Sequence, residues 1–71
     1  MIFDRKYFDE LLEFNEINIG DLVKYINIKY DYKMSYRNFQ RVLSNEIEWK
    51  LEQALIVCDV LDVPLEQLFR L

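Results

Sequence analysis

The sequence predicts an all-α fold of five helices in a single domain, residues 1–71, and three observations carry this prediction. Apolar residues recur at spacings of three and four along most of the chain. Gly20 and Pro64 are its only glycine and proline, so few strong breakers interrupt these patterns. Hydrophobic residues make up 52% of the sequence, which is typical of a folded domain rather than a disordered tail.

The first two helices are predicted from their N-caps and apolar stripes. Asp4 caps a first helix, and after a connection at 15–18 the pair Asn18 and Asp21 forms a capping box for a second helix that ends near Asn27. The stripe of the first helix is Tyr7, Phe8, Leu11, Leu12 and Phe14. The stripe of the second is Ile19, Leu22, Val23 and Ile26.

The segment Ile28–Met34 alternates apolar and polar residues as a strand would, but the sequence offers no second strand to pair with it. We therefore expect an extended loop. Tyr30 or Tyr32 would cover the edge of the core, while Lys29 and Lys33 would point to solvent or phosphate.

The helix predicted over Ser35–Asn45 carries the functional interpretation. Ser35 supplies an N-cap hydroxyl. At about 100° per residue one side is apolar and is expected to be buried: Tyr36, Phe39, Val42 and Leu43. The remaining arc holds side chains that can bond to base edges or phosphates: Arg37, Asn38, Gln40, Arg41, Ser44 and Asn45. This pattern is typical of a recognition helix, although an ordinary amphipathic helix with a solvated polar face has the same composition.

The last two helices follow a short connection at 46–48. We expect the longest helix over Trp49–Leu61 and a last helix that Pro64 opens. The inward positions of the long helix are Leu51, Ala54, Leu55, Cys58 and Leu61, and Leu65, Leu68 and Phe69 close the core. A second apolar stripe on the long helix consists of Trp49, Ile56 and Val60. It is a partner surface, or the last helix covers it, or Trp49 fills a gap beside the Ser35–Asn45 helix.

The sequence lacks the residues that several classes of function usually require. Histidine is absent, and there is no glycine-rich phosphate loop and no cluster of metal ligands, so we expect no enzyme, no cofactor and no metal. The lone Cys58, between apolar neighbours, is expected to be a small core residue. No apolar run approaches the length of a membrane span, and a core this small predicts no small-molecule ligand. We expect a cytoplasmic protein.

Charge is distributed unevenly along the chain. The net charge is −4. Between Leu22 and Asn45, however, five lysines and arginines face one aspartate, which gives a local charge of +4, and the rest of the chain carries −8. A basic patch on an acidic domain can bind phosphates while limiting non-specific adhesion. The patch includes the proposed recognition helix.

The pattern from Ile19 to Phe69 resembles the Cro/CI-type (XRE) helix-turn-helix family of bacterial and phage regulators. The ending, Leu51-Glu52 through Leu61-Asp62-Val63-Pro64-Leu65-Glu66-Gln67-Leu68-Phe69, carries the clearest likeness. Met34-Ser35 followed by Phe39 and Arg41-Val42 is similar to the family's recognition helix, and Leu22-Val23 stands where the family has leucine-alanine.

Three departures from the family pattern are visible. Ile19 replaces a glutamine that grips the phosphate backbone, and Asn27 and Asp62 replace glycines. About six extra residues, 28–33, lengthen the turn between the two core helices of the motif. Some temperate-phage repressors look similar in having such a lengthened turn.

The resemblance implies a small regulator of a phage or prophage genetic switch that binds duplex DNA. Arg37, Asn38 and Gln40 would meet base edges. Phosphates would be held by Arg41, Ser44, Asn45, Lys29 and Lys33, while Tyr36 would take either role or be buried. Such a domain usually dimerises, with Trp49, Ile56 and Val60 as the candidate seam. The alternative is an antirepressor or modulator of repression that binds a partner repressor protein.

Overall fold

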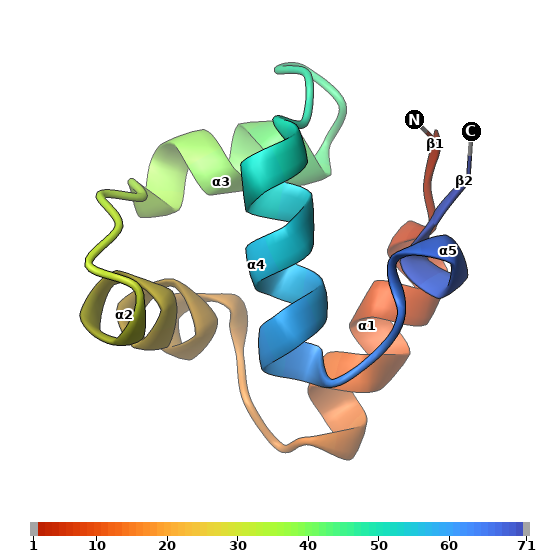
Figure 1. Ribbon diagram of the computed structural model, residues 1–71, viewed down its shortest axis with the longest axis horizontal. Helices are drawn as coiled ribbons and strands as arrows, with labels where there is room; N and C mark the ends of the chain where they lie inside the picture. Colours follow the sequence, from red (N-terminus) through yellow and green to blue (C-terminus); the bar gives the residue numbers. More distant parts are fainter. Residues whose placement is uncertain (1, 71) are drawn as a thin grey trace.

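Five helices and one pair of short strands form the computed structural model, which describes residues 2–70 (Figure 1). In chain order the elements are β1 (Ile2–Phe3), α1 (Arg5–Phe14), α2 (Ile19–Lys29), α3 (Tyr36–Leu43), α4 (Leu51–Leu61), α5 (Leu65–Leu68) and β2 (Phe69–Arg70). The predicted helical class is confirmed, with a small two-stranded sheet added to it. In Figure 1, α4 runs through the middle of the molecule, with α2 and α3 on one side and α1, α5 and the strands on the other.

The three predicted side-chain N-caps are present. The carboxylate of Asp4 accepts a hydrogen bond from the backbone N–H of Tyr7 at 3.0 Å. Asn18 accepts from the N–H of Asp21 at 2.8 Å, and the Asp21 carboxylate accepts from the N–H of Asn18 to complete the capping box. At the start of α3, Ser35 accepts from the N–H of Asn38. Local sequence therefore fixes where these helices begin.

The end of α2 differs from the prediction. The helix continues past Asn27 to Lys29, and Asp31 in the following loop takes the left-handed conformation with φ of 50°. Asn27 therefore lies inside the helix and is not its C-cap. Its side chain bonds to the backbone of Met34. Tyr30 and Tyr32 both pack against the core edge, as expected for the loop.

The core draws apolar side chains from all five helices. The largest of its fully buried side chains are Phe8, Leu22, Ile26, Phe39, Leu43, Val57 and Leu68. Cys58 is buried as predicted, and burial raises the pKa of its thiol above the ordinary value. A buried thiol that stays protonated packs as a small apolar residue.

The inward face of α4 was predicted correctly at Ala54, Cys58 and Leu61 and wrongly at Leu51 and Leu55. The buried residues of this helix are Ala54, Val57, Cys58 and Leu61, which form an i, i+3, i+4, i+7 stripe. Leu51 and Leu55 lie off that stripe and are 58% and 50% exposed. Phe14 at the end of α1 is also exposed. Because α4 is apolar on more than one side, its composition allows two stripes, and packing selects the one with smaller side chains.

Trp49 belongs to an aromatic cluster in the core and not to an exposed stripe. It precedes α4 and is only 9% exposed. Its ring centroid lies 4.8 Å from those of Phe3 and Phe69, and 5.9 Å from that of Phe39. The predicted Trp49, Ile56 and Val60 surface is therefore incorrect, since Trp49 fills space beside α3 and the other two are half-buried against the core.

The two ends of the described chain pair with each other. β1 and β2 are antiparallel, with Ile2 opposite Arg70 and Phe3 opposite Phe69 (Figure 1). The N–H of Asp4 extends this pairing by donating to the carbonyl oxygen of Leu68 at 2.9 Å. Sequence periodicity missed the strands because two residues are too few to show an alternation.

Candidate nucleic-acid interface

Helix α3 is anchored by one face and presents the other to solvent. Phe39, Val42 and Leu43 are almost fully buried, whereas the polar residues between them lie at the surface. In Figure 1, α3 lies across the top of the view, between α2 and the beginning of α4. The division into a packed face and a polar face follows the 3.6-residue period of its sequence.

The structure places the predicted contact residues at the surface with one partial exception. The exposed residues are Lys29, Lys33, Tyr36, Arg37, Asn38, Arg41, Ser44 and Asn45. Gln40 is half-buried, and its side-chain amide donates to the Tyr36 hydroxyl at 2.8 Å. Gln40 is therefore held by a neighbour one turn away. The side chain of Asn38, which the sequence also predicts to contact bases, makes no hydrogen bond among the described residues.

Tyr36 was expected on the buried side of α3, but about half of it is exposed. Its ring lies over the start of α2, where a Cβ at Gly20 would be 3.8 Å from the ring carbon Cε1. A Cβ at that distance would make only an ordinary van der Waals contact, so the ring does not require a glycine at this position. Tyr36 therefore joins the first turns of α2 and α3 and offers its ring edge and hydroxyl at the surface between them.

The cations of the Leu22–Asn45 segment are not neutralised by neighbouring carboxylates. The salt bridges found among residues 2–70 join Arg5 to Asp9 and Arg70 to Asp4, all outside this segment. Helix α3 contains two arginines and no carboxylate. Arg37 and Arg41 are four residues apart on one face, a spacing at which like charges destabilise a helix by about 0.2–0.5 kcal/mol. The two arginines repel each other in the free protein, and an anionic partner would reduce this repulsion.

Lys29 is held in place by two aromatic rings. Its ammonium lies 5.5 Å from the ring centroid of Tyr25 and 5.4 Å from that of Tyr30. The pKa of Lys29 is raised above its ordinary value, chiefly through its interaction with the Tyr25 hydroxyl. Tyr30 in turn donates its hydroxyl to the carboxylate of Asp59 on α4. Lys29 is therefore an exposed and fully charged ammonium on an ordered part of the surface.

The beginning of α2 does not provide a second anion contact. The capping box occupies the N–H groups of Asn18 and Asp21, and the Asp21 carboxylate lies in its first turn. Ile19, at the first helical position, has no polar side-chain atom and is half-buried. A negative charge next to this end repels phosphate. Any anion bound by this face would depend on α3 and the cations near it.

Ser44 and Asn45 have a structural role at the end of α3. Ser44 is the C-cap, and Asn45 takes the left-handed conformation with φ of 63°. The N–H of Asn45 donates to the carbonyl oxygen of Val42 at 3.1 Å. Asparagine tolerates this conformation better than most residues. Ser44 and Asn45, which the sequence predicts to contact phosphates, thus also end the helix.

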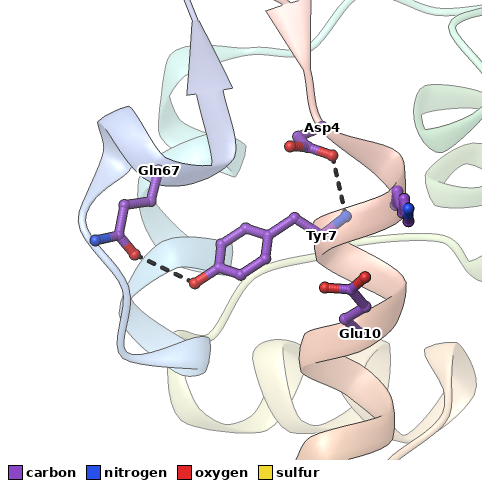
Figure 2. Close-up of a pocket in the computed structure, with 5 residues that line it drawn as sticks. Asp4, Tyr7, Glu10 and Gln67 are labelled. Carbon is purple, nitrogen blue, oxygen red and sulfur yellow. Dashed lines mark hydrogen bonds between the residues drawn. The ribbon is translucent and has the colours of Figure 1, made fainter.

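A separate hollow of about 500 Å³ lies between α1 and α5, lined by Asp4, Lys6, Tyr7, Glu10 and Gln67. Figure 2 shows two hydrogen bonds in it: the Tyr7 hydroxyl donates to Gln67, and the Asp4 carboxylate accepts from the backbone N–H of Tyr7. None of the lining residues is buried. The bond from Tyr7 to Gln67 joins α1 to α5, which gives these two residues a structural role.

No cluster of three or more metal-ligating side chains occurs within residues 2–70. None of the helices in that range combines the length and the apolar character that crossing a membrane requires. Comparisons with protein-family models, with curated proteins and with solved structures find no match to this chain.

Proposed function

We propose that this protein is a small DNA-binding transcriptional regulator of a phage or prophage switch, built as a Cro/CI-like helix-turn-helix domain with a lengthened turn. One observation carries the proposal: the exposed face of α3 has two arginines, no carboxylate and no salt bridge among the described residues, on a chain whose net charge is −4. On an acidic protein, an unneutralised basic helix face favours a polyanionic partner.

The proposed roles follow the observed placement. Arg37 and Asn38 have free, exposed side chains in the first turn of α3 and are assigned to base edges. Arg41, Lys29 and Lys33 are assigned to phosphates. Gln40 and Tyr36 are assigned together, because they are hydrogen-bonded to each other, and the tyrosine would make the contact with DNA.

Binding to duplex DNA from the region upstream of the protein's own coding sequence tests this function. Fluorescence anisotropy over a salt series should show affinity that falls steeply with salt, with a log–log slope of about −0.9 for each phosphate neutralised. Arg41→Glu should abolish the binding. Lys6→Glu makes the same charge change on exposed α1 and should leave binding nearly intact. Equal losses in the two variants would overturn the assignment to α3.

A domain of this kind usually reads two half-sites as a dimer. The candidate seam is the exposed pair Leu51 and Leu55, one turn apart on α4, in place of the incorrect Trp49 stripe. Light scattering of the purified protein, with Leu51→Gln/Leu55→Gln as the comparison, measures whether this pair joins two copies.

A second candidate function is that of an antirepressor or modulator of repression, which binds a partner repressor. The observation that favours it is the charge of −8 outside the Leu22–Asn45 segment, because an acidic surface complements the basic DNA-reading face of a repressor. Absence of DNA binding at low salt, together with an isolable complex with a repressor encoded nearby, would favour this candidate.

A further inference from the structure

A partly apolar groove lies on residues that the α3 surface does not use. The connection between α1 and α2, one side of α2 and the C-terminal end of α4 enclose a volume of about 330 Å³. Its apolar lining comes from Ile17, Leu22, Tyr25, Val60 and Leu61. Asn15 and Asp21 supply the polar part. This volume is near the lower limit for ligand pockets, and it suits one or two inserted side chains.

The groove keeps apolar surface in contact with water. Tyr25 is 49% exposed although it lines an apolar wall, and Ile17 and Val60 are only half-buried. Phe14, which directly precedes the lining residue Asn15, is 84% exposed. A hollow lined by large apolar side chains next to a further exposed aromatic residue is the kind of surface that partner side chains fill.

One carboxylate lines this groove, and two more adjoin its lining residues along the chain. Asp21 lines it, Glu16 stands between the lining residues Asn15 and Ile17, and Asp62 directly follows Leu61. All three are exposed. The cations nearby are Lys24, within residues 15–25, and Lys29, whose ammonium lies 5.5 Å from the ring centroid of Tyr25. Three carboxylates against two cations leave a net negative charge, which favours a cationic occupant.

Backbone geometry does not explain one of these carboxylates. Glu16 and Asp62 both have left-handed backbones, with φ of 55° and 57°. Aspartate tolerates this conformation better than most residues, whereas glutamate is a poor choice for it. Conformation alone therefore does not account for the glutamate at position 16.

We propose that this groove binds a basic segment of a protein partner, which inserts an apolar side chain between Ile17, Tyr25 and Val60 and places lysines or arginines beside the acidic rim. DNA would be repelled by the rim. A second copy of this chain is disfavoured too, because a symmetric contact here would bring two identical acidic rims together. The groove shares no lining residue with the α3 surface, and the proposal does not depend on whether α3 binds DNA.

Short fluorescein-labelled peptides and the full chain test this proposal by fluorescence anisotropy. The probe is a lysine-rich peptide with two leucines one helical turn apart. One matched peptide replaces its lysines with glutamates, and the other replaces its leucines with serines. The lysine–leucine peptide should bind saturably and at least about tenfold more tightly than either control peptide. Equal binding of all three peptides would overturn the proposal.

Variants of the protein locate the site. Tyr25→Ala removes apolar lining and keeps a good helix former, and Glu16→Asn/Asp62→Asn removes two charges while keeping a residue that tolerates the left-handed backbone. Each should weaken peptide binding at least about tenfold. The matched control Glu48→Gln/Glu52→Gln removes two exposed charges elsewhere and should leave affinity unchanged.

Two results would assign the groove differently. If the control pair weakens binding as much as the Glu16 and Asp62 pair does, the peptide senses total charge and the proposal fails. If light scattering shows a dimer of this chain that Tyr25→Ala dissociates, the occupant is a second copy and the proposed partner is wrong. Circular dichroism of each variant confirms that it is folded.

Discussion

The side chain of Asn27 holds the backbone of Met34 with two hydrogen bonds of 2.8 Å. Its Oδ1 accepts from the N–H of Met34, and its Nδ2 donates to the Met34 carbonyl oxygen. This pair closes the loop between α2 and α3 and places Ser35 where it can cap α3. One polar side chain in α2 thus holds the backbone directly before the residue that caps the basic helix.

Asn27→Asp should lower the free energy of unfolding by about 1–3 kcal/mol, because it keeps the acceptor for Met34 but turns a carboxylate oxygen toward the Met34 carbonyl. Urea unfolding followed by circular dichroism measures this change. Asn38→Asp is the control, since Asn38 is exposed in the first turn of α3, where a carboxylate should raise the free energy of unfolding slightly and not lower it. Equal effects of the two substitutions would contradict a specific role for Asn27.

Arg37→Glu should stabilise the free protein and remove its affinity for DNA. The substitution converts the repulsion between Arg37 and Arg41 into an i, i+4 attraction, and it places a carboxylate in the first turn of α3. Together these effects should raise the free energy of unfolding by about 0.5–1 kcal/mol at low salt. Thermal unfolding and DNA anisotropy on the same samples measure both quantities. Loss of stability in this variant would show that Arg37 makes a folding contact.

The buried ring of Trp49 should contribute strongly to stability. Trp49→Ala should lower the free energy of unfolding by about 3–5 kcal/mol, because it empties a site packed by Phe3, Phe39 and Phe69. Trp49→Phe should cost much less. It keeps an aromatic ring and removes Nε1, a buried donor without a hydrogen-bond partner among the described residues.

The wild-type protein provides the independent readout for this site. Its tryptophan emission should be blue-shifted and poorly quenched by acrylamide, and the shift should disappear in urea. Emission like that of free tryptophan in the native protein would contradict the aromatic cluster, whatever the stability of the variants.

The Tyr30–Asp59 hydrogen bond should be lost at high pH. Hydrogen bonding to the Asp59 carboxylate, with smaller effects of burial and charge, raises the pKa of Tyr30 above its ordinary value of 10.0. Since the folded-state pKa is the higher one, the stabilisation is fully present below pH 10.0 and disappears as the pH rises through the folded-state pKa. Tyrosine-labelled ¹³C NMR titration measures the value directly.

Asp59→Asn should move the pKa of Tyr30 back toward its ordinary value, because a neutral amide removes the charge that opposes ionisation. Tyr30→Phe identifies the resonance and should make stability less dependent on pH in this range. An unchanged Tyr30 titration in Asp59→Asn would contradict the observed contact.

Features set by neighbouring residues could be predicted from the sequence, and features set by distant ones could not. The caps at Asp4, Asn18 and Ser35 depend on groups three residues away, and all three predictions are confirmed. The clamp from Asn27 to Met34 and the pairing of Phe3 with Phe69 depend on chain segments whose meeting no local pattern encodes.

Errors about the candidate site have equally specific causes. The stripe of Trp49, Ile56 and Val60 was drawn on a helix that starts at Trp49, whereas α4 begins at Leu51. Tyr36 continues the stripe of Phe39 and Leu43, so its sequence position left open whether it was buried or a DNA contact, and about half of it is exposed. Surface placement of the α3 arginines could be predicted, because a 3.6-residue period separates them from the apolar positions.

The pairing of β1 with β2 also sets the order of events during synthesis. Phe69 packs against Phe3 and Trp49, and Leu68 is fully buried, so the aromatic cluster cannot be completed until residue 69 has been made. Until residue 69 leaves the ribosome, the rings of Phe3 and Trp49 in the nascent chain lack their last partner. We therefore expect cooperative folding of this domain only after residue 69 has left the ribosome.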